Sequence, residues 1–179
     1  VDVFLHNEIW SCFHAHSDLN ELEQQDIIEA LNQRITDFKD NVKQASHFIV
    51  TFGTAWVYRF IDTKEIVANC HKIPQQKFVK ELLSINDCQQ AIYQIESGLR
   101  KINPNIQIIY TLSPVRHIKD GFVENQRSKA HLIAALHQHL QQNQQLNYYF
   151  PSYEIMMDEL RDYRFYGKDL IHPNELAVD

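Results

Sequence analysis

Two short, almost uninterrupted apolar runs constrain the fold of this chain more than any other feature. The first covers residues 47–52 (His-Phe-Ile-Val-Thr-Phe), and the second covers residues 106–112 (Ile-Gln-Ile-Ile-Tyr-Thr-Leu). Runs of this length, rich in β-branched and aromatic residues, are typical of strands buried on both faces, as in a parallel sheet. We therefore expect two central strands, with a shorter third strand at 147–150.

Amphipathic helices are predicted between these strands. Apolar residues recur at every third or fourth position in the segments 19–39, 84–102 and 124–142. Such alternation of helix and strand predicts an α/β fold, a three-layer α/β/α sandwich with a mostly parallel sheet and helices on both faces. One excursion is expected at about 56–70, where two strand-like runs flank a polar turn as in a β-hairpin.

The bulk composition excludes several classes of protein. The net charge of −6 argues against a nucleic-acid-binding protein, which needs a basic surface. No apolar run approaches the length of about 18 residues that a membrane span needs. A chain of 179 residues without an internal repeat or a linker is expected to form a single domain over residues 1–179.

The cysteines and histidines do not indicate a disulfide framework, a metal site or a cofactor. Cys12, Cys70 and Cys88 are odd in number and irregularly spaced, so we expect free thiols in a reducing compartment, the cytoplasm. His137 and His139 lie two positions apart on a predicted helix, so their side chains point in different directions.

Polar segments follow both predicted central strands at the points where these strands end. Residues 53–56 (Gly-Thr-Ala-Trp) follow the first strand, and residues 113–117 (Ser-Pro-Val-Arg-His) follow the second. Ligands of open parallel sheets bind beyond the carboxyl ends of the strands. Both segments are therefore expected at one edge of the sheet, together with the late loop that carries Asp169 and His172.

An acid and a histidine stand three positions apart in residues 169–173 (Asp-Leu-Ile-His-Pro). Pro173 is expected at the first position of a helix, with His172 at or beside the cap, where the helix dipole keeps the imidazole available as a base. Asp169 would accept a hydrogen bond from the other ring nitrogen, as the acid does in a serine-hydrolase triad. Such a pair also arises by chance, so it indicates catalysis only together with a scaffold and a nucleophile.

Five blocks carry a family resemblance. They are residues 51–58 (Thr-Phe-Gly-Thr-Ala-Trp-Val-Tyr), 67–72 (Val-Ala-Asn-Cys-His-Lys), 112–117 together with 124–129, 149–154 (Tyr-Phe-Pro-Ser-Tyr-Glu) and 169–173. In this order they resemble the GSCFA-domain proteins, bacterial relatives of the SGNH (GDSL-type) esterases, over nearly the whole chain. The resemblance implies a flavodoxin-like fold and ester or acyl hydrolysis by a Ser-His-Asp arrangement, with Asp169 and His172 on the terminal Asp-x-x-His block.

The resemblance also implies a nucleophilic serine in an early Gly-Ser-Cys-Phe-Ala motif, which this chain lacks. Residues 10–14 (Trp-Ser-Cys-Phe-His) contain Ser-Cys-Phe, but no glycine precedes Ser11 and histidine stands where the family has alanine. Because the chain opens at Val1 without a methionine, we expect the nucleophile and a central strand upstream of Val1, and the end of the last helix beyond residue 179. Ser11 is the alternative nucleophile.

A second departure concerns the oxyanion hole. SGNH relatives carry Gly-x-Asn-Asp after a middle strand, and the matching frame here has Ala55 in place of the asparagine. The Gly53 N–H would still donate, while the Thr54 hydroxyl or Asn69 would replace a donor whose loss costs about 3 kcal/mol. The alternative role of Thr54 and Asn69 is to form turns.

Two residues after the second central strand are candidates for binding substrate. Arg116 is placed to hold a carboxylate or a phosphate, and the alternative is an ion pair with a structural acid such as Asp120 or Glu124. His117 is expected to line the same site.

The leading hypothesis is an SGNH-type serine hydrolase that cleaves a small-molecule or glycan ester and needs no cofactor. An acyltransferase acting on sugars would use the same residues. A non-catalytic domain that keeps the binding cleft but not the nucleophile is the third hypothesis, and the departure at Ala55 favours it.

Overall fold

The computed structural model describes residues 2–143 and 145–179, and the chain divides into two compact units. The first unit comprises Val1–Gln44 and Trp56–Leu82, and the second comprises Ala45–Ala55 and Leu83–Asp179. Within the described residues, no helix is long and apolar enough to cross a membrane.

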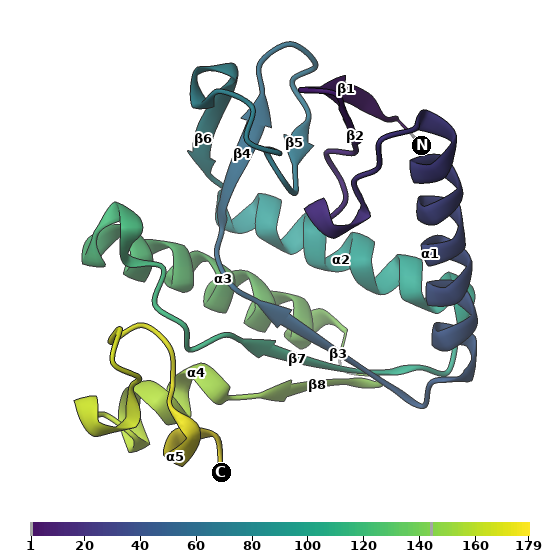
Figure 1. The fold of residues 1–179 in the computed structure, drawn as a ribbon. Coiled ribbons are helices and arrows are strands. Elements are labelled where there is room, and N and C mark those ends of the chain that lie inside the picture. The colour runs from purple at the N-terminus through teal and green to yellow at the C-terminus, as the bar shows by residue number, and fades with distance from the viewer. Residues whose placement is uncertain (1, 144) are drawn as a thin grey trace. The chain divides into compact units, whose positions relative to one another are not determined.

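The second unit is built on a parallel sheet of three strands. They are β3 (His47–Phe52), β7 (Gln107–Leu112) and β8 (Asn147–Phe150), in the order β3-β7-β8. The register pairs Phe48 with Ile108, and Ile108 with Asn147. The predictions of an α/β fold and of strands at 47–52, 106–112 and 147–150 are therefore confirmed (Figure 1). Of the two strands expected at the centre, only β7 is central, because β3 lies at an edge of this sheet.

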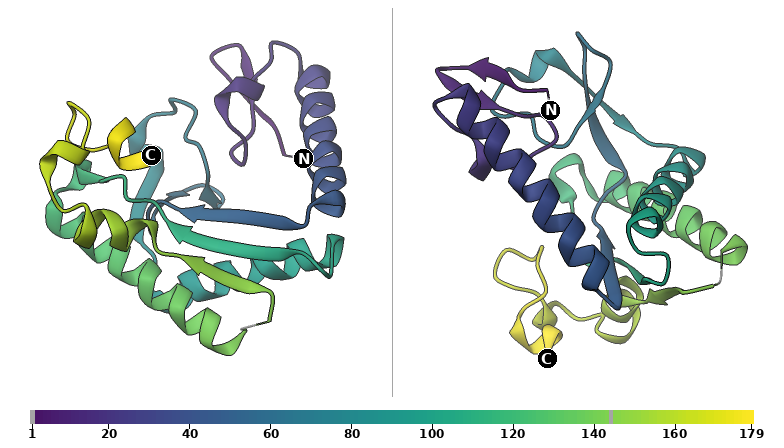
Figure 2. Two further views of the ribbon diagram at one scale, coloured as in Figure 1. Left: turned by 90° about the horizontal axis from the view of Figure 1, so that it is seen from below. Right: turned by 90° about the vertical axis from the view of Figure 1, so that its right-hand side faces the viewer.

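The two long helices of this unit lie on one face of the sheet (Figure 2). Helix α2 (Ile85–Ile102) leads into β7 and helix α3 (Phe122–Gln142) leads into β8, and the two helices pack against each other (Figures 1 and 2). Both connections step along the sheet in the same direction, and right-handed crossovers of this kind place their helices on the same side. Ile108, Tyr110 and Leu112 are fully buried on that face.

Within the described residues of the second unit, the opposite face of the sheet carries exposed side chains, and one edge has no strand partner. Ile49, Tyr148 and Phe150, which alternate with the buried residues, are 65%, 49% and 53% exposed. Among the residues that the structure describes, β3 pairs only with β7, so its other edge carries backbone groups without a strand partner there. A parallel sheet is normally covered on both faces. The described residues of this unit form one layer of long helices on a three-stranded sheet, so the prediction of a three-layer sandwich is not confirmed.

The first unit contains the predicted excursion from the parallel sheet. Strands β4 (Trp56–Phe60) and β5 (Ile66–Val67) form the expected antiparallel hairpin. A third strand, β6 (Phe78–Leu82), pairs with the other side of β4 and was not predicted. Its first residue, Phe78, packs in an aromatic cluster with Phe13 and Phe60, which fixes this strand in the sheet.

The first helix begins later than its apolar stripe predicts. Strands β1 (Phe4–His6) and β2 (Ile9–Ser11) form a hairpin, and helix α1 spans Gln24–Gln44 instead of 19–39. The reason is that Trp10 and Glu21 exchange two backbone hydrogen bonds, of 2.7 and 3.2 Å. Residue 21 is therefore held as an extended bridge and cannot join the helix.

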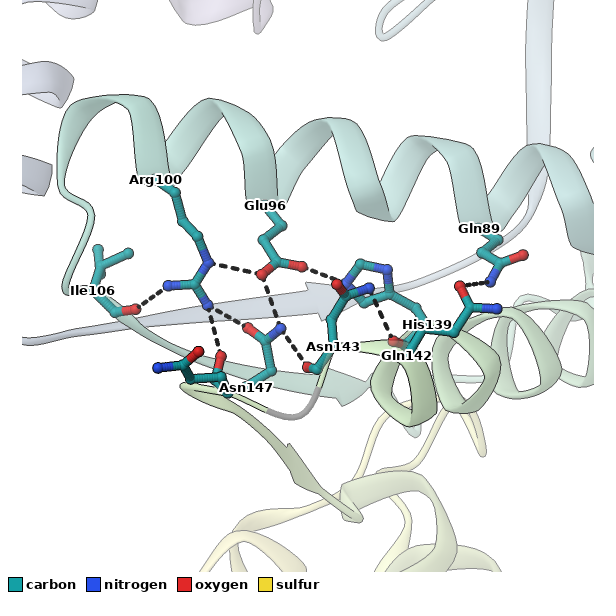
Figure 3. Close-up of polar contacts among 9 residues, drawn as sticks. Gln89, Glu96, Arg100, Ile106, His139, Gln142, Asn143 and Asn147 are labelled. Carbon is teal, nitrogen blue, oxygen red and sulfur yellow. Dashed lines mark hydrogen bonds and ion pairs between the residues drawn. The ribbon is translucent and has the colours of Figure 1, made fainter.

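A buried polar network joins α2, α3 and β8 in the second unit (Figure 3). The Arg100 guanidinium donates to Glu96 Oε1 (2.7 Å) and to Asn147 Oδ1 (2.8 Å). The Glu96 carboxylate also accepts from Asn147 Nδ2 (2.9 Å) and lies 2.6 Å from His139 Nε2. Burial alone would raise the pKa of Glu96, but the hydrogen bonds from Arg100, Asn147 and His139 outweigh it and lower the pKa.

Replacing the charge at the centre of this network should destabilise the protein. We expect Glu96→Gln to lower the free energy of unfolding by roughly 3 kcal/mol at pH 7, because Arg100 would lose the carboxylate it faces. A carboxyl group whose pKa is lower in the folded than in the unfolded protein stabilises the fold at pH values above its ordinary pKa. That stabilisation is lost as the pH falls through the pKa of the folded state. The difference in free energy of unfolding between the unsubstituted protein and Glu96→Gln, measured by chemical denaturation, should therefore become smaller at acidic pH.

The matched control is Asp158→Asn. Asp158 is 88% exposed and forms a loose ion pair of 3.6 Å with Arg161, so its loss should change stability by less than about 1 kcal/mol. Equal effects of the two substitutions would contradict the structural role of the Glu96 network.

Candidate functional site

A buried lysine holds together the ends of two strands in the second unit. Lys129 of α3 is 1% exposed, and its ammonium group donates to the backbone carbonyls of Gly53 (2.7 Å) and Ser113 (2.6 Å). These residues directly follow β3 and β7, and the Ser113 N–H also donates to the Phe52 carbonyl (2.9 Å). Burial lowers the pKa of Lys129 to about 8.

Lys129 is not among the residues predicted from the sequence, although its position carries a signal. Lys129 lies three and seven residues before Leu132 and Leu136 on the apolar stripe of α3, where a solvated lysine is not expected. A lysine on a buried stripe indicates polar partners in the interior.

The turn after β3 is fixed by Ser128, the neighbour of Lys129. The Ser128 hydroxyl accepts from the Ala55 N–H (2.7 Å) and lies 2.9 Å from the Thr54 hydroxyl. Ala55 is 1% exposed, so the residue that replaces the expected asparagine belongs to the core. The Thr54 hydroxyl, one of the predicted oxyanion donors, has Ser128 as its hydrogen-bond partner.

The carboxylate of Asp169 makes two separate sets of hydrogen bonds. Its Oδ1 accepts from the backbone N–H groups of Ile171 (2.9 Å) and His172 (3.1 Å), while its Oδ2 lies 2.7 Å from His172 Nδ1. The loop includes Leu170 in the left-handed region, with φ of 57°. The hydrogen bond with His172, followed by the two backbone bonds, lowers the pKa of Asp169 to about 2.

The predicted helix start after His172 is wrong by two residues. The last helix, α5, covers Glu175–Val178, and its cap is Asn174, whose side chain accepts from the Ala177 N–H at 3.1 Å. Asparagine caps helices better than histidine or proline, and Pro173 instead forms an isolated bridge with Tyr166. His172 therefore lies before the cap of a very short helix, and its tautomer depends on Asp169 and not on a helix dipole.

The segment after β7 contacts the loop that carries Asp169 and His172. The Arg116 N–H donates to the Ile171 carbonyl (3.2 Å), and its guanidinium donates to the Leu170 carbonyl (2.8 Å). The predicted residues Arg116, Asp169 and His172 therefore belong to one region at the carboxyl ends of the strands.

His117 lies against the glycine that follows β3. A Cβ atom added to Gly53 would lie 3.3 Å from His117 Nε2, so the absence of a side chain at Gly53 permits this approach. The His117 N–H is anchored by Asn125 Oδ1 (2.8 Å). Burial, and then the positive charges of Lys129 and His172, lower the pKa of His117 and favour its neutral form.

The remaining candidates, Ser11 and Asn69, lie in the first unit. Ser11 ends β2 and is 2% exposed, and Asn69 Oδ1 accepts from the His71 N–H at 3.0 Å. Together with His71 they line a cavity of about 520 Å³ that is formed entirely by this unit. Asn69 therefore supports the turn at His71, where φ is 47°.

Comparison with known proteins gives one match. The model of the GSCFA family matches residues 1–179, the whole chain. No curated protein and no solved structure matches.

The electrostatic influence of His172 on His117 can be measured without any catalytic assay. We expect His172→Gln to raise the pKa of His117, because a positive charge that opposes its protonation is removed. The measurement is a pH titration of the histidine ring resonances by NMR. His137→Gln is the matched control, since His137 is not among the causes of the lowered pKa of His117. If the pKa of His117 is the same in His172→Gln as in the unsubstituted protein, the charge of His172 does not influence His117.

Proposed function

The chain belongs to the GSCFA family, and from this premise we propose that it is a serine-dependent ester or acyl hydrolase of the SGNH type. His172 is the general base and Asp169 is its orienting acid. The observation that carries the proposal is the 2.7 Å contact between Asp169 Oδ2 and His172 Nδ1 in a loop beside the strand ends.

The protonation states follow from this contact. Asp169 has its pKa lowered to about 2, so it is a carboxylate at neutral pH and can only accept a hydrogen bond. His172 Nδ1 must then carry the proton, which leaves Nε2 as the basic nitrogen. The His172 side chain is 62% exposed, so Nε2 is accessible to a serine hydroxyl.

The reaction then runs in two steps. His172 Nε2 takes the proton of the serine hydroxyl while the serine oxygen bonds to the carbonyl carbon, and it returns that proton to the departing alcohol. In the second step His172 Nε2 takes a proton from a water molecule, whose oxygen bonds to the acyl carbon. The bond to the serine oxygen breaks, and Nε2 returns the proton to that oxygen, which releases the acid. Acyl transfer would replace this water with a sugar hydroxyl, so the ratio of free acid to acylated sugar distinguishes the two activities.

The open edge of β3 supports a position for the nucleophile. Ser46 and Phe52 accept backbone hydrogen bonds from β7 and its flanks, so the even-numbered residues of β3 face β7. The alternating residues, Ile49, Thr51 and then Gly53, direct their backbone groups toward the open edge. We place the serine on a further strand paired with this edge, where the Gly53 N–H would face the oxyanion.

The same strand would complete the predicted flavodoxin-like sandwich. Its connection to the rest of the chain would supply the second helical layer, which would cover the exposed Ile49, Tyr148 and Phe150. In this arrangement the nucleophile comes from residues upstream of Val1, as the family resemblance implies.

The location of the nucleophile can be tested with a fluorophosphonate probe. In the native protein, including its residues before Val1, the probe should modify one serine upstream of Val1, and His172→Ala should prevent modification because the hydroxyl would lose its base. Peptide mapping by mass spectrometry identifies the serine. Modification of Ser11 instead would assign the reaction to the alternative nucleophile.

Substitution of the acid tests the role of its two oxygens. We expect Asp169→Asn to lower kcat for p-nitrophenyl acetate by about 10³–10⁴-fold, because the amide can still accept from the loop but donates a hydrogen bond where His172 needs an acceptor. The full-length protein is assayed, with Asp40→Asn as control, since Asp40 lies on the exposed face of α1. Full activity of Asp169→Asn would exclude the triad.

A further inference from the structure

A cavity in the second unit lies beside the loop that carries His172. It has a volume of about 340 Å³. Its wall is formed mainly by Arg116, Gln126, Met156, Arg161, Tyr163 and Tyr166. Arg116 joins this cavity to the candidate site, because it hydrogen-bonds the carbonyls of Leu170 and Ile171, the two residues before His172.

The Arg116 side chain is held in place without an acid. Its guanidinium lies 5.4 Å from the ring of Phe122, 6.0 Å from Tyr163 and 5.6 Å from Tyr166. Cation–π contacts of this kind orient the group but do not neutralise it. Among the described residues, one guanidinium hydrogen bond, to the Leu170 carbonyl, fixes the side chain further.

The ion pair considered from the sequence is not formed. Among the residues that the structure describes, Arg116 has no carboxylate partner, and Glu124 pairs with Arg127 at 2.8 Å. Arg161 adds a second positive charge, although Asp158 lies 3.6 Å from it. Among the described residues that line the cavity, the one acid is Asp162, whose Oδ1 accepts from the Arg164 N–H (2.8 Å).

We propose that this cavity binds a carboxylate or phosphate group of the substrate through Arg116, so that the ester cleaved at His172 belongs to an acidic molecule such as a sugar acid. The proposal rests on the proposed hydrolase function for its catalytic part. A guanidinium has five N–H donors in a planar fork, and Arg116 retains donors that suit a two-oxygen anion. The Tyr163 and Tyr166 rings and Met156 supply apolar surface for the rest of the molecule.

Binding is tested first, independently of catalysis. Isothermal titration of the full-length protein compares D-glucuronate with D-glucose, which lacks the carboxylate, and with glucose 6-phosphate. We expect one of the two anions to bind at least about 10-fold more tightly than glucose, because a charge-assisted hydrogen bond is added. The anion that binds more tightly shows whether the site prefers a carboxylate or a phosphate. Equal affinities for D-glucuronate, glucose 6-phosphate and D-glucose would overturn the proposal.

Variants locate the anion in the cavity. Arg116→Gln keeps a side-chain donor for the Leu170 carbonyl but removes the charge, and Arg161→Ala alters the cavity without contacting that loop. Both should reduce the advantage of the anion over glucose. Arg164→Ala is the matched control, since this exposed arginine lies over Phe165 and is not in the wall; an equal loss in this control would refute a specific site.

Kinetics separates binding from support of the loop. We expect Arg116→Gln to lower kcat/KM at least about 10-fold more for p-nitrophenyl hemisuccinate than for p-nitrophenyl butyrate, which has no carboxylate. Equal losses would mean that Arg116 only positions the loop. Absence of cleavage of both esters would instead count against the hydrolase, while the titration would still decide whether the anion site exists.

Discussion

The two hydrogen bonds of Lys129 are the interaction on which the rest of the second unit's site depends. Parallel strands end with carbonyl groups that the ladder no longer satisfies, and here those of Gly53 and Ser113 converge on one buried ammonium. The charge is costly to bury, as its lowered pKa indicates. In return, the segments after β3 and β7 are held at a fixed separation, and these segments carry Gly53, Arg116 and His117.

A second constraint operates in the late loop, where one carboxylate has two roles. Asp169 Oδ1 closes a turn on the backbone of Ile171 and His172, and Oδ2 orients the imidazole. The loop offers little burial to hold these residues, since the Asp169 and His172 side chains are 46% and 62% exposed. Their geometry is therefore set by local hydrogen bonds and by Arg116, which fastens the preceding carbonyl of Leu170.

The sequence predicts the elements whose signal is local and misses those that depend on tertiary contacts. The apolar runs at β3 and β7 are strong local signals, and both strands are present. Strand β6 carries Lys80 and Glu81 among its apolar residues, so only its pairing with β4 reveals it. The predicted start of α1 was wrong because the backbone bridge between Trp10 and Glu21 keeps residue 21 out of the helix. The predicted start of α5 was wrong because Asn174, and not His172, caps that helix. Of the site, residue identity indicates Asp169 and His172, whereas the role of Lys129 requires knowing which carbonyls it reaches.

The open edge of β3 connects these observations to the chemistry. A parallel sheet gains stability from burial on both faces, so an edge next to exposed Ile49 is unfavourable unless another element covers it. Gly53 follows the last residue of that edge. Because Gly53 has no side chain, His117 can approach it closely. Under the proposed function, one further strand paired with this edge would cover β3 and would also carry the serine beside the Gly53 N–H.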